Sequence, residues 1–487
     1  MSKKFHIHTF GCQMNVHDSE KIAGILSESG YEESDGLKEA DVIVLNTCSI
    51  RQKAEQKFYS ELGRLKDIKD RNPALRIAVA GCIAQQKGSA LFERFPYVDF
   101  IFGPQNIDHL GKWINENPPS PPFAKGGKGG FSVAIGDNLE YTDKILPLKR
   151  EGQVRAWVAI MHGCDNFCSY CVVPYTRGRE KSRPVSDVVN EVEGLSAQGF
   201  REITLLGQNV NSYGKNLNET NMLERDTKNN EKNPPFPPLA KGGEGGFFNQ
   251  NIDFPDLLKV IYEVNDIQRI RFITSHPRDL SEKLIKTMRD LPKVCEHLHL
   301  PIQAGSDNIL ALMNRGYSYG QYKDKIDMLR TEIPDIAITT DIIVGFPGET
   351  DDDFEYTVNA LKEIEFDGIF AFKYSKRPGT KAVDLPNHAD EKTKSLRLSK
   401  VLDLQAEITL RKNKMLEGKI LEILVEGSSE TDKDKLTGRT GSNKIVNFYG
   451  DKKNTGSLVN VRILKAKQHS LYGEIMGRLY SDERLKE

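Results

Sequence analysis

The sequence predicts an α/β protein with an N-terminal Rossmann-like parallel-sheet domain, a central partial (β/α)6 barrel and a small C-terminal β-barrel. Strand and helix patterns alternate in two long regions, which is typical of parallel sheets. Near the C-terminus, short strands with glycine turns follow a long helical pattern, as expected for a small barrel. We expect an N-terminal domain at 1–116, an insert at 117–131, the barrel at 150–385, a helical connection at 386–410 and the C-terminal domain at 411–480.

Composition indicates a protein of the reducing cytoplasm without a membrane span. Of the 487 residues, 38% are hydrophobic and 28% charged, and the formal net charge is −1. A polyanionic partner would therefore need a local basic patch. The sequence has no apolar run long enough to span a membrane, and its N-terminus lacks the apolar core of a signal peptide. Seven cysteines are too sparse for a secreted disulfide scaffold and favour metal or redox use.

One long motif occurs twice, as NPPSPPFAKGGKGGF at 117–131 and NPPFPPLAKGGEGGF at 233–247. Twelve of its fifteen positions agree between the copies. Prolines and glycines at this density exclude helices and central strands. We interpret both copies as flexible surface inserts, the second within a polar loop from about 216 to 251.

Cysteines follow three of the four strands predicted in the N-terminal domain. The patterns KFHIHTF, DVIVLNT and RIAVAG lead to Cys12, Cys48 and Cys82, and VDFIFG forms the fourth strand. Helical patterns separate them, among them HDSEKIAGILSESG with Asp18 or Ser19 as its cap. Because parallel strands end at one edge of a sheet, we expect the three cysteines to converge on a shared metal site.

Six further strands are predicted in the central region: AWVAIMHG, EITLLGQ, RIRFITSH, EHLHLPIQ, IAITTDIIVGFPG and GIFAFKYS. Helical patterns lie between them, one ending at Gly199 and another beginning at Ser306. Chemistry in such barrels takes place at the carboxyl ends of the strands. The polar residues at those ends are Gln208, Asn209, Ser275, His276, Gln303, Glu349 and Ser375. Together they indicate a polar barrel mouth.

The first of these strands leads into GCDNFCSYC, in which Cys164, Cys168 and Cys171 have the spacing C-x3-C-x2-C. A structural zinc ion would need a fourth ligand, for which His162 or Cys295 is available. A 4Fe-4S cluster held by three cysteines instead leaves one iron open to a substrate or cofactor. The spacing alone leaves both alternatives open.

Longer motifs resemble one enzyme family. C-x3-C-x2-C after the first barrel strand is the signature of the radical SAM enzymes. GCDNFCSYCVVPYTRGRE, LLGQNVNSYG, LHLPIQAGSDNILALMNRGYS, TDIIVGFPGET and KYSKRPGT resemble the methylthiotransferase family, in particular its branch that modifies N6-dimethylallyladenosine in tRNA. FGCQMNVHDSE, NTCSIRQKAEQK and AGCIAQ are similar to the N-terminal domain of that family. These motifs cover nearly the whole chain outside the two inserts.

The resemblance implies two 4Fe-4S clusters and S-adenosylmethionine (SAM) as cofactors, with no catalytic side chain beyond the clusters. The implied ligands are Cys164, Cys168 and Cys171 for the cluster that binds SAM, and Cys12, Cys48 and Cys82 for an auxiliary cluster. One SAM would methylate a sulfur associated with the auxiliary cluster, and a second would generate the radical that takes hydrogen from carbon 2 of the adenine. The N-terminal sheet edge must then close over the mouth of the radical SAM barrel. Cys295 matches neither set and is expected to be a core thiol.

Candidate SAM contacts rest on strand-end position alone, and each could instead cap a helix: Gln208, Ser275, Gln303 and Glu349. Candidate RNA contacts come from two regions. TRGREKSR, beside the cluster loop, contributes Arg177, Arg179 and Arg183. LTGRTGSNKIVNF and GSLVNVRILKA resemble the TRAM domain, an OB-like RNA-binding module, and contribute Arg439, Lys444, Arg462, Lys465 and Lys467.

The resemblance implies methylthiolation of carbon 2 of N6-dimethylallyladenosine at position 37 of tRNA. The implied partners are a tRNA anticodon stem-loop, in which the base is already partly exposed, and an unidentified electron donor; we expect a monomer. One alternative is the same chemistry on threonylcarbamoyladenosine or on a ribosomal protein aspartate. Another is a non-enzymatic protein that binds metal and RNA. LLGQNVNSYG and VVPYTRGRE resemble the dimethylallyladenosine branch more than the other two branches.

Overall fold

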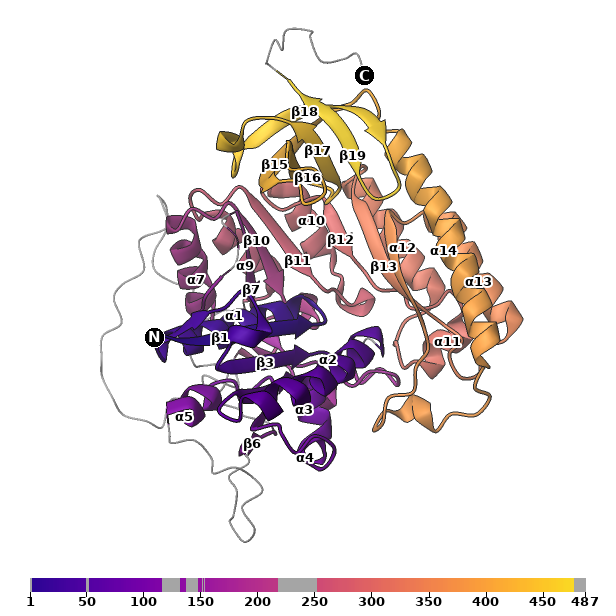
Figure 1. Ribbon diagram of the computed structural model, residues 1–487. Coiled ribbons are helices and arrows are strands. Elements are labelled where there is room, and N and C mark those ends of the chain that lie inside the picture. Colours follow the sequence, from indigo (N-terminus) through magenta and orange to yellow (C-terminus); the bar gives the residue numbers. More distant parts are fainter. Residues whose placement is uncertain are drawn as a thin grey trace.

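The computed structural model describes residues 2–49, 52–115, 132–136, 148–150, 152, 154–217 and 252–476. Both copies of the proline–glycine motif, and the part of the predicted polar loop from 218 to 251, lie outside these residues. Figure 1 shows the partial barrel between the N-terminal sheet at one end and the C-terminal barrel at the other. The two ends of the central barrel are therefore covered by different parts of the chain.

The N-terminal domain contains a six-stranded parallel sheet in the order β2-β1-β3-β4-β5-β6. Its strands are β1 (Lys3–Phe10), β2 (Tyr31–Glu33), β3 (Val42–Thr47), β4 (Arg76–Gly81), β5 (Phe100–Phe102) and β6 (Ser132–Ala134). The four predicted strands are confirmed. The strands that were not predicted, β2 and β6, have three residues each, too few for a recognisable pattern. The strand order changes direction between β1 and β3, where doubly wound sheets bind their ligands.

Helices cover both faces of this sheet. One face is covered by α1 (Gln13–Glu28) and α5 (His109–Asn115), and the other by α2 (Gln52–Arg71), α3 (Cys82–Lys87) and α4 (Ala90–Arg94). The N-cap residue of α1 is Cys12, so the prediction that Asp18 or Ser19 caps this helix is wrong. Only Gly11 and Cys12 separate β1 from α1, which places Asp18 inside the helix, where it is buried.

The central region has six parallel strands in two groups, β7-β10-β11 and β12-β13-β14. A parallel bridge between Ile270 and Val294 joins the groups. The strands are β7 (Arg155–Ala159), β10 (Glu202–Leu206), β11 (Arg269–Ile273), β12 (His297–His299), β13 (Ala337–Val344) and β14 (Gly368–Lys373). All six predicted strands are confirmed, and each lies beside its neighbours in sequence, as in a partial barrel.

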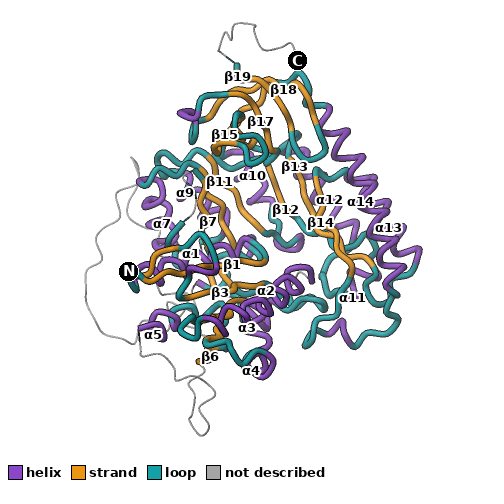
Figure 2. Tube along the Cα trace, in the orientation of Figure 1, coloured by secondary structure: helices purple, strands orange, loops and turns teal. Residues whose placement is uncertain are grey.

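Helices pack on the outer side of these strands (Figure 2). They are α7 (Val185–Ala197), α9 (Phe254–Tyr262), α10 (Glu282–Asp290), α11 (Asp307–Leu312), α12 (Tyr319–Glu332), α13 (Asp351–Ile364) and α14 (Glu391–Lys414). The predicted ends at Gly199 and Ser306 are confirmed: Gly199 follows α7 with a φ of +94°, and Ser306 is the N-cap residue of α11. None of the helices in the described residues is both long enough and apolar enough to cross a membrane.

The C-terminal domain is a closed barrel, which confirms the predicted small β-barrel, and its five strands have the order β15-β16-β17-β19-β18. The strands are β15 (Ile420–Ser428), β16 (Lys435–Thr440), β17 (Ile445–Tyr449), β18 (Leu458–Ala466) and β19 (Leu471–Ile475). The long helix α14 runs along the outside of the central barrel and leads into β15 (Figure 1).

The turn between β16 and β17 docks on the amino-terminal end of the central barrel. Arg271 of β11 donates from Nη1 to the carbonyl oxygen of Gly441 at 2.8 Å and from Nη2 to that of Thr440 at 2.7 Å. The same guanidinium pairs with Glu202 of β10 at 3.0 Å. The C-terminal barrel therefore forms the floor of the central barrel, opposite the mouth where the strands end.

Candidate functional site

Cys12, Cys48 and Cys82 lie together at the carboxyl edge of the N-terminal sheet. In the register of the sheet, Phe10 lies opposite Thr47, and Thr47 lies opposite Gly81. These three residues form one row across the sheet, and each cysteine follows its residue of that row by one or two positions. The topology brings together three residues that are far apart in sequence.

Two glycines allow these strand ends to approach closely. Gly11 has a φ of +145°, and a Cβ there would lie 2.5 Å from the Cβ of Cys48. Gly81 has a φ of +89°, and a Cβ there would lie 2.4 Å from the carbonyl oxygen of Thr47. Any larger residue would clash and would also have to adopt a conformation that favours glycine. Both positions therefore require glycine for the cysteine edge to form.

At this edge the surroundings of Cys12 stabilise thiolate, the form of cysteine that binds iron. A hydrogen bond with Cys48 and the positive charge of Arg177 together outweigh burial and lower the pKa of Cys12 to about 6. Burial raises the pKa of Cys82, and Arg177 acts against this increase. Cys12 also lies at the N-terminus of α1, where the helix dipole favours negative charge. The edge can thus receive a cationic iron–sulfur core.

Arg177 connects this edge to the central barrel. Its Nη2 lies 2.7 Å from Oδ2 of Asp18 in α1, and both side chains are about 5% exposed. The side-chain amide of Gln105 donates to the carbonyl oxygen of Arg177 at 2.8 Å. The prediction that Arg177 contacts RNA is therefore wrong, because its guanidinium is buried and already paired with a carboxylate.

A second buried network lies beside the first. Arg150 pairs with Glu20 of α1 at 3.7 Å and also with Glu191 of α7. Arg183 donates from Nη1 to Glu191 at 2.7 Å and to the carbonyl oxygen of Ala159 at 2.6 Å. Because the Arg183 side chain is largely buried and its charge is already balanced, the prediction that it contacts RNA is also wrong.

The second set of cysteines lies in one loop. Cys164, Cys168 and Cys171 fall between β8 (Met161–His162) and α6 (Val173–Thr176), and β8 pairs with β9 (Lys181–Ser182). The N–H of Cys171 donates to the carbonyl oxygen of Cys168 at 2.9 Å, which closes the turn. Burial raises the pKa of Cys164 to about 11 and that of Cys171 to about 12, and the nearby Cys168 sulfur contributes to both increases. Three thiolates this close together need a cationic partner.

A buried arginine lies against this loop. Arg315 donates from Nη1 to Cys168 Sγ and to the Tyr170 hydroxyl, each at 3.4 Å, from Nη2 to the Pro301 carbonyl oxygen at 2.7 Å, and from Nε to the Tyr317 hydroxyl at 3.0 Å. None of its partners in the described part of the chain is a carboxylate. An uncompensated buried charge costs several kcal/mol, on the order of 3–5. A 4Fe-4S cluster bound by three thiolates carries negative charge and would compensate Arg315, so these residues fit that group.

Zinc is the less suitable alternative. Within the described ranges, no group of three or more His, Cys, Asp or Glu side chains is arranged to hold a metal ion. A 4Fe-4S cluster binds its cysteines through different iron atoms, so its ligands need not converge on one point. Of the proposed fourth zinc ligands, His162 is buried, and burial lowers its pKa to about 3, which keeps the imidazole in the neutral form that can bind a metal. Cys295 lies near the floor, where its N–H donates to Ile270 and burial raises its pKa to about 11.

The N-terminal domain closes over the barrel mouth (Figure 1), and three groups of contacts join the two. Cys12 and Met14 pack against Ala159 and Leu206, the last residues of β7 and β10. On the opposite side of the mouth, Arg377 pairs with Glu55 of α2 at 3.1 Å. Contacts between α3, which begins with Cys82, and α6, which follows Cys171, complete this roof.

Gln208 and Ser275 have the properties of ligand contacts. Oε1 of Gln208 and Oγ of Ser275 are buried and have no hydrogen-bond partner among the described residues. Buried polar atoms are usually hydrogen-bonded, so these two atoms at the mouth suit a bound polar ligand. Their role as SAM contacts remains a prediction.

Gln303 and Glu349 have backbone and loop roles. Gln303 is buried with a φ of +74°, and its N–H donates to the carbonyl oxygen of Asp341 at 2.9 Å. Oε2 of Glu349 accepts from the N–H of Gly345 and from Arg397, each at 2.6 Å. Glu349 therefore anchors the loop after β13, and only its Oε1 lacks a protein partner.

Two of the RNA candidates in the C-terminal domain are part of the floor. Nε of Arg439 pairs with Glu426 at 3.0 Å. Lys444 pairs with Asp367 at 3.3 Å and donates to Asn413 at 2.9 Å. Both side chains are mostly buried where the C-terminal barrel docks, so the prediction that they contact RNA is wrong.

The remaining RNA candidates are exposed. Arg462, Lys465 and Lys467 are exposed on or next to β18. Arg179 is 72% exposed and pairs with Asp165 at 2.6 Å. Its guanidinium lies 5.9 Å from the ring centroid of Phe167, which is also exposed. Arg179 and Phe167 thus form an aromatic and cationic surface at the loop that carries Cys164, Cys168 and Cys171, called the SAM loop below. Such surfaces can bind nucleic acid.

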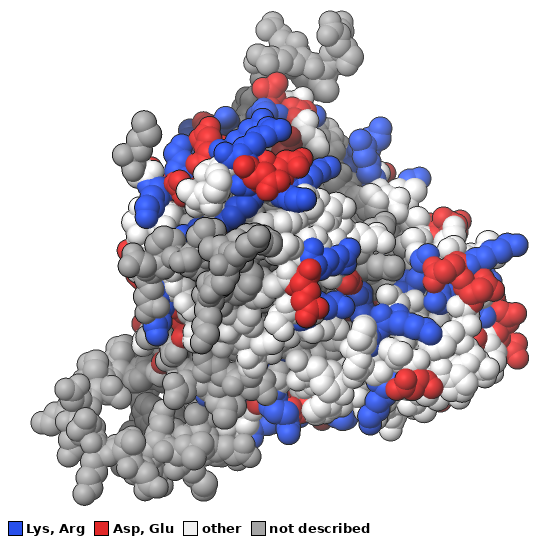
Figure 3. All heavy atoms as spheres, turned by 60° about the horizontal axis from the view of Figure 1, so that its bottom comes forward, with Lys and Arg blue, Asp and Glu red and all other residues white. Residues whose placement is uncertain are grey.

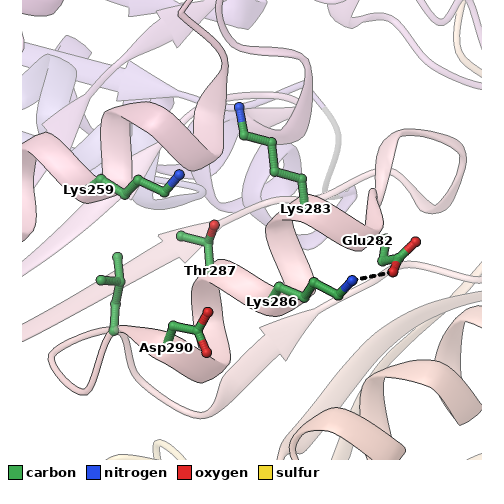
Figure 4. A pocket seen from close by; sticks show the side chains of 7 residues that line it. Lys259, Glu282, Lys283, Lys286, Thr287 and Asp290 are labelled. Carbon is green, nitrogen blue, oxygen red and sulfur yellow. Dashed lines mark ion pairs between the residues drawn. The ribbon is translucent and has the colours of Figure 1, made fainter.

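Surface charge is otherwise mixed. On the face shown in Figure 3, basic and acidic side chains are interspersed. A groove between α9 and α10, on the outer side of the barrel, is lined by Lys259, Lys283 and Lys286 (Figure 4). Lys286 pairs with Glu282 at 2.5 Å and Lys283 with Asp256 at 2.7 Å. These lysines are paired with carboxylates and lie on the outer side of the barrel, so we assign the groove no part in the site.

Sequence reasoning missed Asp18 and Arg315. The sequence pattern predicts Asp18 or Ser19 as a helix cap, whereas Asp18 is the ion-pair partner of Arg177. Arg315 lies within the motif MNRGYS, and a basic residue that follows an apolar helix could have drawn attention to it. Its contact with Cys168 joins positions far apart in sequence, so no local pattern reveals it.

The family models that match the chain agree with this organisation. The chain matches the models of the Uncharacterized protein family UPF0004 at residues 4–103, the Radical SAM superfamily at 158–361 and the TRAM domain at 414–476. A solved structure of the radical S-adenosylmethionine methyltransferase TsrM from Kitasatospora setae is 15% identical, with a TM-score of 0.47 over 79% of this chain and 77% of that one.

Curated relatives match almost end to end. A tRNA-2-methylthio-N(6)-dimethylallyladenosine synthase of Thermodesulfovibrio yellowstonii is 51% identical over 471 residues, 97% of this chain and 98% of that protein. A synthase of the same name from a Thermoanaerobacter species is 45% identical over 474 residues, 97% of this chain and 92% of that protein. The chain therefore belongs to the tRNA-2-methylthio-N(6)-dimethylallyladenosine synthase family within the radical SAM superfamily.

Proposed function

We propose that this protein adds a methylthio group to carbon 2 of N6-dimethylallyladenosine at position 37 of tRNA, next to the anticodon. The observation that carries the proposal is the meeting of two cysteine sets at one barrel mouth, in a chain whose near full-length relatives bear that name. An aromatic C–H bond is a poor target for acid–base catalysis, so a cofactor must supply the reactivity.

Cys164, Cys168 and Cys171 would hold the cluster that binds SAM, and Cys12, Cys48 and Cys82 the auxiliary cluster. When bound, the two clusters and SAM supply the methyl group, the sulfur and the hydrogen abstraction that methylthiolation requires. Gln208 and Ser275, with their unpartnered oxygen atoms, are the candidates to contact SAM.

The chain's own residues orient these groups and exclude water. Arg315 donates to Cys168 and balances negative charge at the SAM loop. The buried pair of Arg177 and Asp18 fixes the auxiliary edge against the barrel. The roof formed by the N-terminal domain keeps the region between the two sets away from bulk solvent, which protects reactive species.

RNA would bind along the side of the molecule. The C-terminal barrel occupies the floor and the N-terminal domain the roof, so a bound anticodon stem-loop must reach the mouth laterally. Arg462, Lys465 and Lys467 can contact phosphates at one end, and Arg179 with Phe167 can contact nucleotides beside the mouth.

The alternatives have less support. The curated relatives cited above carry the dimethylallyladenosine name, and neither is named for threonylcarbamoyladenosine or a ribosomal protein. A non-enzymatic metal protein would not need a buried arginine that lies against one cysteine set and, within the described residues, has no carboxylate partner.

Nucleoside analysis tests the proposal. tRNA from a strain that lacks the protein should contain dimethylallyladenosine without its methylthio group, and the gene should restore the group. Anaerobic reconstitution should bring about eight irons per chain and SAM cleavage on reduction. Unchanged methylthiolation in the deletion strain would contradict the proposal.

A further inference from the structure

The inner face of β14 carries two exposed phenylalanines that the site described above does not use. Phe370 and Phe372 are 52% and 38% exposed, although large aromatic side chains usually contribute to cores. They alternate with Ile369 and Ala371, which pack against the main core on the outer side of the strand. Since neighbouring residues of a strand point to opposite faces, both phenylalanines face the barrel interior.

This strand reaches from the floor to the roof of the barrel. Asp367, just before β14, pairs with Lys444 of the C-terminal barrel, and Arg377, just after it, pairs with Glu55 of the N-terminal domain. In the described sheet β14 is an edge strand, so its inner face is open to the side. A nucleotide that enters the barrel from this side would contact the two phenylalanines between the N-terminal domain and the C-terminal barrel.

The neighbours of the phenylalanines make the surface apolar near the mouth and acidic farther in. Phe372 lies opposite Ile343 of β13, and Phe370 lies opposite Asp341. The ring of His299 meets that of Phe370 edge-on, with centroids 5.7 Å apart. Nε2 of His299 lies 3.5 Å from Oδ1 of Asp341.

We propose that Phe370 and Phe372 bind the adenine ring and the N6-dimethylallyl group of the target nucleotide. This inference rests on the proposed function and names the part of the site that selects the substrate. Aromatic faces stack on bases, and a dimethylallyl group gains from apolar contact. Threonylcarbamoyladenosine would instead bring a carboxylate towards Asp341, and like charges in a partly buried site repel each other. The surface therefore favours an uncharged, apolar N6 substituent.

Binding of two matched anticodon stem-loops to the reconstituted enzyme tests this surface. The two RNAs differ only in the dimethylallyl group on the target adenosine, and SAM is omitted so that no reaction occurs. We expect the unchanged enzyme to prefer the dimethylallyl RNA. Phe370→Ala and Phe372→Ala should each reduce affinity for that RNA about tenfold and affinity for the other RNA by less, because the other RNA loses only the stacking on its adenine. Iron content and SAM cleavage should be normal in both variants.

Tyr356→Ala provides the control, because Tyr356 is 59% exposed but lies on α13, on the outer side of the barrel. It should leave both affinities unchanged. If an alanine variant loses iron, Phe370→Leu or Phe372→Leu keeps the apolar bulk and removes only the aromatic face, and it should still weaken binding of the dimethylallyl RNA.

Variants that keep the preference and their iron would overturn the inference, as would variants that change only self-association. Failure of the proposed function is seen separately, because the unchanged enzyme would then not methylthiolate dimethylallyladenosine at all.

Discussion

The two cysteine sets each lie beside one buried arginine, but the arginines have different partners. Arg177, at the auxiliary edge, pairs with the carboxylate of Asp18. Arg315, at the SAM loop, contacts two hydroxyls, one carbonyl oxygen and the sulfur of Cys168. The charge of Arg177 is thus balanced within the protein, whereas that of Arg315 is left for a bound anionic group. The first arginine joins two domains, and the second prepares a site for a cofactor.

This difference reflects how the two sets are built. The auxiliary set is assembled from three strand ends and depends on the N-terminal domain sitting correctly on the barrel. The SAM set is held in one short loop and needs only local geometry. A buried ion pair suits the first task because it tolerates little displacement, although it contributes little net stability.

Replacing one cysteine from each set should have the largest effect and should separate the two roles. Cys168→Ala should lose SAM cleavage completely, because the open iron that binds SAM would be lost. Cys48→Ala should keep SAM cleavage but form no methylthiolated product. Each variant should retain about four of about eight irons per chain after anaerobic reconstitution. Iron analysis and detection of 5′-deoxyadenosine provide the measurements, and Cys295→Ala is the matched control with no loss expected. Loss of SAM cleavage in Cys48→Ala would show that the two sets are not independent.

Breaking the buried pair at the auxiliary edge should destabilise the protein by about 3 kcal/mol. Arg177→Gln leaves the Asp18 carboxylate buried and uncompensated, and Asp18→Asn leaves the guanidinium in the same condition. The double variant removes both charges and should recover most of the loss. Denaturant unfolding of the iron-free chains measures the effect. A double variant as unstable as the sum of the single variants would mean that the two side chains do not interact.

Arg315→Gln, unlike Arg177→Gln, should have little effect on the stability of the iron-free protein and should change the properties of the bound SAM cluster. In the iron-free protein it removes an uncompensated buried charge, so we expect unfolding free energy to stay within about 1 kcal/mol of the unchanged protein or to increase. In the reconstituted enzyme it removes positive charge and a hydrogen bond from a cluster thiolate, which should lower the reduction potential of the SAM cluster by tens of millivolts. Anaerobic titration followed by electron paramagnetic resonance distinguishes the two clusters. A strongly destabilised iron-free Arg315→Gln would mean that the arginine is mainly structural.

The sequence predicts the SAM loop more completely than the auxiliary edge. The spacing of Cys164, Cys168 and Cys171 marks them as a metal-ligand set, which the family resemblance assigns to the SAM cluster, and the positions of Cys12, Cys48 and Cys82 follow from strand alternation. Arg177 and Arg183 look like exposed basic residues in TRGREKSR, yet both are buried by contacts with α1 and α7 that only folding creates. Asp18 was misassigned because a cap and a buried ion-pair partner have the same residue type. Whether a charged residue is exposed depends on domain docking, and a local pattern contains no information about docking.

The smallest predicted effect concerns RNA binding. It depends on whether a basic side chain is exposed or already paired with a carboxylate inside the protein. Arg462→Ala and Lys465→Ala remove exposed charges, so each should weaken binding of an anticodon stem-loop a few-fold and reduce the slope of log affinity against log salt by about 1. Lys444→Ala is the matched comparison, because that lysine already neutralises Asp367 in the floor. It should leave the salt slope unchanged and act only through weaker docking of the C-terminal barrel. If Lys444→Ala lowered the salt slope as much as Arg462→Ala, Lys444 would contact RNA phosphates. The distinction between basic residues that pair inside the protein and basic residues that bind RNA would then be wrong.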